Sequence, residues 1–181
     1  MSLQDEFLNN HEEVRWEGRF ITAKTRGRWE YVGRARNIRA AVILAITPAR
    51  EVILVEQFRV PLGRPCIELP AGLIGDDENS PHEDASLAAL RELEEETGYR
   101  ATHMEALGEF WSSPGMVSES FTLFRAHGLT RVSAGGGVEG EGITVHHVPL
   151  DDIAGYIATC RAQGMAVDVK ILTLLGPGIL G

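Results

Sequence analysis

The sequence is poor in cysteine, in basic residues and in long apolar runs. Its 181 residues include two cysteines, Cys66 and Cys160, without a CxxC pattern or a Cys/His set around them. A disulfide framework is therefore excluded, and we expect a reducing compartment, the cytoplasm. No apolar run approaches the roughly 18 residues that span a bilayer, and the polar N-terminus is unlike a secretory signal, so no membrane association is expected.

Basic residues are outnumbered by acidic ones. The 17 Lys and Arg against 26 Asp and Glu give a formal net charge of −9. Binding nucleic acid by its phosphates needs a Lys/Arg-rich face, so nucleic acid is not an expected partner. A small anion could still bind locally or through metal ions. The apolar content of 44% predicts an ordered globular protein.

The chain divides into two parts by its strand pattern. Strands are predicted at 14–23 and 29–34, joined by a turn at 24–27. A lone hairpin is marginal in water, so it must pack on the body or on another subunit. We treat 1–36 as an N-terminal β extension and 37–181 as the main domain. Strands at 40–47, 51–58, 106–111, 120–127 and 143–148, with helices at 81–97, 151–161 and 167–175, predict an α/β (α+β) fold with a mixed sheet between helices.

The first of these helices has the clearest boundary signals. Ser80 can cap it, Pro81 occupies its first position, and Glu83 completes a capping box. Gly98 stands where a C-terminal glycine is expected.

Three glutamates gather near the end of this helix. Glu95 and Glu96 follow Glu92 by three and four positions, so the three side chains share one helix face. Like charges at this spacing repel, and the helix dipole disfavours anions near a C-terminus. A solvated glutamate-rich face is one interpretation, because glutamate is a good helix former. The other is a site for a hard divalent cation such as Mg²⁺ or Mn²⁺, which prefers oxygen ligands.

The segment from Gly72 to Tyr99 resembles the Nudix box, G-x5-E-x7-R-E-U-x-E-E-x-G-U, where U is aliphatic or aromatic. Its second half matches throughout from Arg91 onward. The first half departs, because twelve residues rather than seven separate Glu78 from Arg91, and counting back from Arg91 leads to Glu83. A five-residue insertion that starts the helix about one turn early is the expected explanation. Neither Glu78 nor Glu83 is assigned a chemical role.

This resemblance implies a Nudix fold and a hydrolase that depends on Mg²⁺, with Mn²⁺ as a substitute. It implies that the metal ligands are Glu92, Glu95, Glu96 and the Ala71 carbonyl, and Glu95 is also counted among the catalytic residues.

Segments outside the box resemble the ADP-ribose and nucleoside-diphosphate-sugar pyrophosphatases. They are Gln57-Phe58-Arg59, the run from Ile67 to Ile74, and Ser113-Pro114-Gly115. In that branch, Pro114 at this distance past the box implies a nucleotide-sugar substrate. Trp29 and Glu30 resemble a segment that stacks on the base, in some members from the partner subunit. Packing of the hairpin is the alternative for Trp29, and Arg59 would pair with a phosphate or be an exposed strand-end charge.

A glycine-rich stretch at 134–143 resembles a loop of the GDP-mannose-cleaving members. There a glutamate near Glu141 lies over the metals, and the glycines would let the loop close on substrate. An unstructured surface loop is the alternative interpretation. Glu119 is a rival candidate for the catalytic base.

The function implied is cleavage of a nucleoside diphosphate sugar, of ADP-ribose or GDP-mannose type, to a nucleoside monophosphate and a sugar phosphate. The alternatives are a hydrolase for another nucleoside diphosphate derivative and a regulator that binds nucleotide sugars without cleaving them. The resemblance also implies a homodimer formed through the N-terminal extension, which would serve dimerisation and base binding.

Overall fold

A computed structural model of the chain describes residues 2–35, 38–75 and 84–180, with no side-chain description at 177–180. The helices are α1 (Leu3–Asn9), α2 (Ala85–Thr97), α3 (Ile153–Ala162) and α4 (Leu172–Leu180), with short 3₁₀ segments η2 (Val60–Leu62), η3 (Leu150–Asp152) and η4 (Val169–Ile171). The strands are β1 (Glu12–Glu17), β2 (Ile21–Arg26), β3 (Trp29–Arg34), β4 (Arg39–Ala45), β5 (Glu51–Arg59), β6 (Arg64–Glu68), β7 (Ala71–Ile74), β8 (Tyr99–Arg100), β9 (His103–Trp111), β10 (Ser120–His127), β11 (Thr130–Arg131), β12 (Thr144–Pro149) and β13 (Ala166–Val167).

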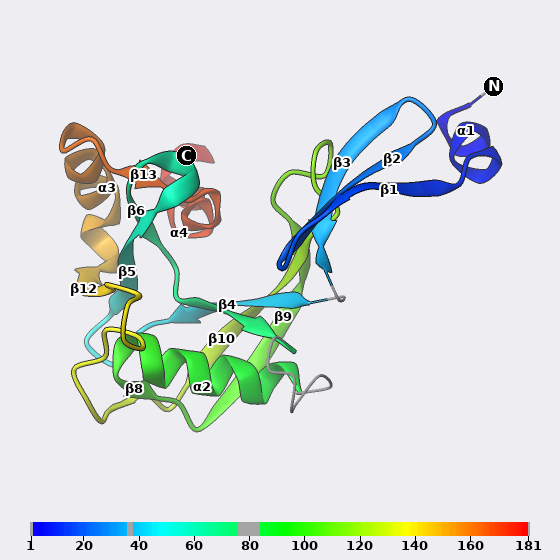
Figure 1. The fold of residues 1–181 in the computed structure, drawn as a ribbon. Coiled ribbons are helices and arrows are strands. Elements are labelled where there is room, and N and C mark those ends of the chain that lie inside the picture. The colour runs from blue at the N-terminus through cyan, green and yellow to red at the C-terminus, as the bar shows by residue number, and fades with distance from the viewer. Residues whose placement is uncertain (1, 36–37, 76–83, 181) are drawn as a thin grey trace.

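The N-terminal extension is a separate antiparallel sheet in the order β1-β2-β3, and it projects from the body with α1 at its tip (Figure 1). The predicted two-stranded hairpin is therefore wrong in its number of strands. A turn at 18–21 splits the predicted first strand, and the Gly18 N–H donates to the Ile21 carbonyl across it at 2.9 Å. The connection to β3 lies at Gly27, whose φ of 59° is left-handed and suits glycine.

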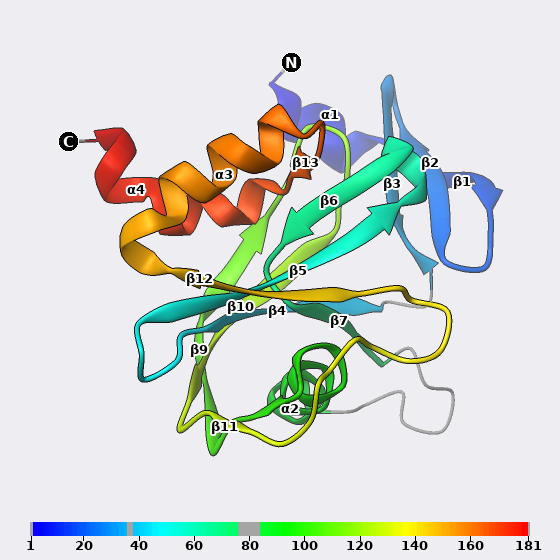
Figure 2. The same ribbon diagram turned by 90° about the vertical axis from the view of Figure 1, so that its left-hand side faces the viewer.

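The body contains two four-stranded sheets, β7-β4-β10-β9 and β12-β5-β6-β13. Each sheet has one parallel pair, β4 with β10 and β6 with β13, among antiparallel ones. Figure 2 shows α2 on one side of the strands and α3 and α4 on the other. The expected mixed sheet between helices is confirmed, with two four-stranded sheets in place of one and a further two-stranded sheet of β8 and β11. Within the described residues, no helix is long and apolar enough to cross a membrane.

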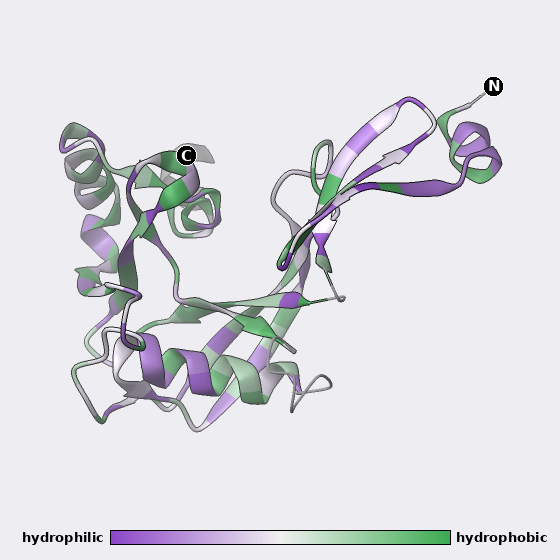
Figure 3. Cartoon of the chain, in the orientation of Figure 1, coloured by the Kyte–Doolittle hydropathy of each residue, from purple (hydrophilic) through white to green (hydrophobic). Residues whose placement is uncertain are grey.

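The core has two parts, one on each face of β4. Successive residues of this strand point alternately into one part and the other. Ala41, Ile43 and Ala45 face the cluster beneath α2, whereas Val42 faces the cluster beneath α3 and α4. A strand buried on both faces needs a nearly continuous apolar sequence, and β4 is mostly hydrophobic in Figure 3. Cys66 and Cys160 are buried free thiols, and burial raises the pKa of Cys66 to about 12.

The start of α2 differs from the prediction. Asp84 is the N-cap, and its carboxylate accepts hydrogen bonds from two backbone N–H groups of the first turn, at 2.9 and 3.3 Å. The predicted start of the helix at Pro81 is therefore wrong, because the helix begins at Ala85, and the predicted cap Ser80 lies outside the described residues. Residues 76–83, which include Glu78 and Glu83, lie outside the described residues.

Candidate functional site

The C-terminal end of α2 faces a cavity of about 380 Å³. Its lining comes from β3, β4, β5, β6, β7, β10, α2, the loops before β10 and β12, and η4. We call it the charged cavity, because its lining includes the carboxylates and cations Arg34, Arg59, Glu68, Glu92, Glu96, Glu119, Glu141 and Lys170.

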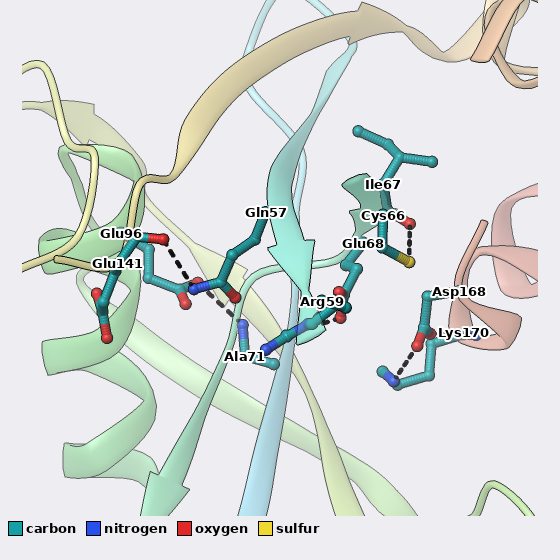
Figure 4. Close-up of polar contacts among 10 residues, drawn as sticks. All are labelled: Gln57, Arg59, Cys66, Ile67, Glu68, Ala71, Glu96, Glu141, Asp168 and Lys170. Carbon is teal, nitrogen blue, oxygen red and sulfur yellow. Dashed lines mark hydrogen bonds and ion pairs between the residues drawn. The ribbon is translucent and has the colours of Figure 1, made fainter. Parts of the chain in front are cut away.

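Glu96 is the most enclosed of the predicted metal ligands. It is 8% exposed, and its carboxylate accepts a hydrogen bond from the Ala71 N–H at 3.0 Å (Figure 4). Burial raises its pKa from 4.5 to about 8, with a smaller opposing effect of the Ala71 N–H and further increases from Glu92 and Glu141. A buried carboxylate crowded by two others is unfavourable unless a cation joins them.

Glu92 lies against the backbone of β7. A methyl group at Gly72 would overlap the Glu92 side chain, so the strand and the carboxylate approach this closely only because residue 72 is glycine. The Glu92 carboxylate contacts the Arg91 guanidinium at 2.9 Å and is 15% exposed. Part of the predicted ligand set, Ala71, Glu92 and Glu96, thus lines one cavity.

Glu95 lies differently from the other two glutamates. Its side chain is 40% exposed and pairs with Arg91 at 3.2 Å, and the charged cavity is lined without it. Residues three and four apart share a helix face, but a face is wide enough for one side chain to turn outward. Its role as a ligand stays a prediction.

The glycine-rich loop is docked on the end of α2. The N–H groups of Gly136 and Gly137 donate to the carbonyls of Glu96 and Glu95 at 2.8 and 3.0 Å. These carbonyls have no partner within the helix. The loop therefore has defined backbone contacts, and it brings Glu141 into the charged cavity, near enough to raise the pKa of Glu96.

Glu119, the rival base, lines the same cavity but is bound to a cation. The Arg34 Nε donates to its carboxylate at 2.6 Å. Arg34 ends β3, so this pair joins the N-terminal extension to the loop before β10.

Arg59 forms an ion pair and is not an isolated surface charge. Its guanidinium makes two bonds to the buried Glu68 carboxylate, at 2.5 and 2.9 Å, and this contact raises the pKa of Arg59. The Lys170 ammonium contacts Asp168 at 2.7 Å and also lines the cavity. In Figure 4, Glu96 and Glu141 lie on one side of Arg59, and Asp168 and Lys170 lie on the other. The cations thus extend away from the glutamate cluster.

A second cavity, of about 310 Å³, lies beneath the N-terminal sheet. We call it the aromatic cavity, and its lining includes Phe7, Arg26, Trp29, Glu30, Tyr31, Pro114 and Val117. Three predicted substrate-binding residues, Trp29, Glu30 and Pro114, therefore lie together, although no residue lines both cavities. The indole of Trp29 is 47% exposed and lies near the Arg28 guanidinium, 5.7 Å from the ring centre.

Among the charged residues of the charged cavity, sequence reasoning missed Arg34, Glu68 and Lys170, and it named Gln57 only as part of a longer segment. Arg34 and Lys170 come from the two ends of the chain, and no local pattern distinguishes them from ordinary surface cations. Glu68 was inside the recognised segment, and its apolar neighbours were a signal that a charge there would need a partner.

The acidic half of the charged cavity fits a hard divalent cation. Its donors are oxygens of Glu92, Glu96 and Glu141, and burial together with the neighbouring Glu92 and Glu141 raises the pKa of Glu96. Mg²⁺ and Mn²⁺ prefer such donors.

Comparison with known proteins gives relatives of similar kinds. The chain is 38% identical over 123 residues to a methanol dehydrogenase activator of Bacillus methanolicus (67% of this chain, 64% of the relative). It is 39% identical over 189 residues to an ADP-sugar pyrophosphatase of Mus musculus (91% and 84%). It is 37% identical over 144 residues to a GDP-mannose pyrophosphatase of Cronobacter sakazakii (75% and 70%). The chain thus spans less than two thirds of the first of these relatives.

A solved structure and a family model also match this chain. A crystal structure of an ADP compounds hydrolase superposes with a TM-score of 0.68 at 23% identity, covering 93% of this chain and 91% of that one. At this identity the likeness concerns the fold. The NUDIX domain model matches residues 36–165, most of the chain, and the chain therefore belongs to the Nudix family.

Proposed function

We propose that the protein is a Mg²⁺-dependent hydrolase that cleaves the pyrophosphate bond of a nucleoside diphosphate sugar, of ADP-ribose or GDP-mannose type. The observation that carries this proposal is the composition of the charged cavity. Carboxylates that suit divalent cations adjoin guanidinium and ammonium groups that suit phosphates. The names of the mouse and Cronobacter relatives support a nucleotide-sugar substrate.

Glu92, Glu96 and the Ala71 carbonyl would hold the divalent cation, with Glu95 as a further ligand at the exposed side. When bound, such a cation polarises the phosphoryl group and stabilises charge on the leaving oxygen. The protein's own contribution is a fixed carboxylate cluster, because Glu96 is bound to the backbone of β7 and Glu92 packs on Gly72.

Glu141 is the better candidate for the base that orients the attacking water and takes its proton. It faces Glu96, whereas the Glu119 carboxylate is held by Arg34. Glu119 would then keep Arg34 directed toward the cavity. Arg34, Arg59 and Lys170 would bind the phosphate oxygens, with Arg59 fixed by Glu68.

We further propose that the protein is a homodimer formed through the N-terminal extension. The three-stranded sheet projects from the body (Figure 1) and exposes large apolar side chains, including Val14, Trp16, Phe20 and Ile21. Such a surface favours burial against another subunit. Removing residues 1–35 should yield monomers with weakened substrate binding, which analytical ultracentrifugation and KM measurements would detect. A dimer with normal affinity would contradict this.

The free, buried thiols of Cys66 and Cys160 support a reducing compartment, and we propose the cytoplasm. The net charge of −9 supports a small-molecule substrate and argues against nucleic acid as a partner.

The decisive experiment is incubation with a panel of nucleotide sugars and Mg²⁺, followed by measurement of the released nucleoside monophosphates. ADP-ribose would give AMP and ribose 5-phosphate, and GDP-mannose would give GMP and mannose 1-phosphate. Glu96→Gln should abolish turnover, and Glu141→Gln should lower kcat far more than Glu119→Gln. Binding of nucleotide sugars without any hydrolysis would instead support the regulator.

A further inference from the structure

The loop that carries Glu141 has two parts with different attachments. Its first part is fixed on α2 by the N–H groups of Gly136 and Gly137, which donate to helix carbonyls at 2.8 and 3.0 Å. The second part, 138–142, forms a tight turn with local bonds. The Glu141 N–H donates to the Val138 carbonyl at 3.2 Å, and the Val138 N–H donates to the Glu141 carboxylate at 2.9 Å.

These local bonds shape the turn but do not fix it relative to the cavity. Glycines at 137, 140 and 142 all have positive φ, at 75°, 98° and 61°. Glycine restricts the backbone least, so a turn flanked by three glycines has little intrinsic stiffness. A contact with a rigid part of the fold is needed to hold residue 141 in one position.

Gln57 makes such a contact. Its Nε2 donates to the Glu141 backbone carbonyl at 3.2 Å, and Figure 4 shows the side chain directed at that residue. Gln57 belongs to β5, which pairs with β12 on one side and β6 on the other, and the β12 pairing begins at Thr144 opposite Glu56. Residues 52–55 of the same strand are buried. The donor is therefore mounted on one of the best-anchored strands of the body.

We propose that Gln57 is a positioning residue: it holds the backbone at Glu141 so that this carboxylate stays over Glu92 and Glu96 in the charged cavity. The proposal rests on the function proposed above, in which Glu141 acts on the attacking water. Gln57 would act through Glu141 rather than on the substrate itself. A small displacement of a catalytic group lowers the rate steeply, because the reacting geometry is narrow.

The kinetic test is a double-mutant cycle of Gln57→Leu and Glu141→Gln, with Mg²⁺ and a nucleotide sugar that the wild-type protein hydrolyses. Losing one neutral hydrogen bond should lower kcat about 5- to 10-fold with KM nearly unchanged. In the Glu141→Gln protein, Gln57→Leu should cause no further loss. A full further loss in that background, or a raised KM with unchanged kcat, would mean that Gln57 contacts the substrate and would overturn the proposal.

The structural test does not depend on activity. Hydrogen exchange of the metal-free, substrate-free protein should be faster at 138–142 in Gln57→Leu, while the amides of Gly136 and Gly137 keep their protection. Gln163→Leu, at the exposed end of α3, is the matched control and should behave as wild type in both tests. Unchanged exchange at 138–142 would refute the tether. If the wild-type protein hydrolyses no nucleotide sugar, the proposed function fails, and exchange alone still decides the tether.

Discussion

The charged and aromatic cavities are similar in size but opposite in chemistry. The charged cavity, about 380 Å³, collects acids and cations from both ends of the chain, whereas the aromatic cavity, about 310 Å³, is lined by Phe7, Trp29, Tyr31 and Pro114 among its residues. The first suits ions and phosphates, and the second suits a flat ring. Within one chain, the residues predicted for chemistry and those predicted for base recognition are thus separated. Variants in each cavity should therefore affect different kinetic constants.

The largest effect is expected from Gly72→Ala in the charged cavity. An added methyl group would overlap the Glu92 side chain, which can turn away without unfolding β7. The proposed cation would lose a ligand, and kcat/KM should fall about 10³-fold, as is typical when an electrostatic contact to the transition state is removed. The melting temperature should change little.

Gly176→Ala is the matched control for this variant, because Gly176 lies in α4 and lines neither cavity. No atom of the described residues lies within 4 Å of an added Cβ there, and its φ is not in the left-handed region. Its kcat/KM should stay near the wild-type value. Full activity of Gly72→Ala would contradict the assignment of the glutamate cluster.

The second effect concerns the stability of the metal-free protein as a function of pH. Because the pKa of Glu96 is about 8 in the folded state against 4.5 ordinarily, the folded state binds its proton more tightly than the unfolded state. The free energy of unfolding should therefore fall as pH rises from about 4.5 to about 8, by on the order of 5 kcal/mol. Urea unfolding with a chelator present would measure the slope. Glu96→Gln should flatten it, and equal slopes in the two proteins would show that burial of this carboxylate is not the cause.

Local sequence patterns predicted those features of the fold that depend on residues close together in the chain. The second half of the box and Gly98 correctly located the end of α2, because periodicity and a C-terminal glycine are local patterns. The start of α2 was missed because Ser80 with Glu83 and Asp84 are alternative capping signals in the same segment, and the capping rules alone do not choose between them. β4 and β5 were found because they contain continuous apolar runs, whereas the two-residue strands β8, β11 and β13 were not predicted.

The missed residues of the site have a different physical cause. Arg34 and Lys170 reach the charged cavity only because the topology brings residues of β3 and η4 to the lining of the same cavity as α2. The aromatic cavity likewise needs α1, which no sequence pattern had indicated. The glycine loop was predicted to be free to close, but two of its N–H groups are bound to helix carbonyls. Local sequence patterns contain no information on contacts between distant segments, so these contacts could not be predicted from the sequence.

The third effect tests that docked loop. Gly135 has a φ of 69°, and an added Cβ would overlap the Thr97 carbonyl carbon. Gly135→Ala should therefore lower the free energy of unfolding by about 2–3 kcal/mol, from backbone strain and overpacking together. Gly140 also has a positive φ, of 98°, but no atom of the described residues lies within 4 Å of an added Cβ. Gly140→Ala therefore measures the backbone strain without the overpacking. Chemical denaturation would measure both, and equal losses would show that the loop is not packed on α2.

The smallest effect is expected in the aromatic cavity. Trp29→Ala should raise KM for a nucleotide sugar about 10- to 30-fold with kcat nearly unchanged, because stacking on a base contributes about 1–2 kcal/mol. Trp29→Phe keeps an aromatic face and should recover most of the affinity. Trp111→Ala, an exposed tryptophan that lines neither cavity, is the control and should leave KM as it is. The competing interpretation, in which Trp29 only packs the hairpin, predicts a lower melting temperature with KM unchanged. Measuring both quantities on the three variants therefore separates recognition from packing, and a lowered kcat in Trp29→Ala would show that the two cavities do not act independently.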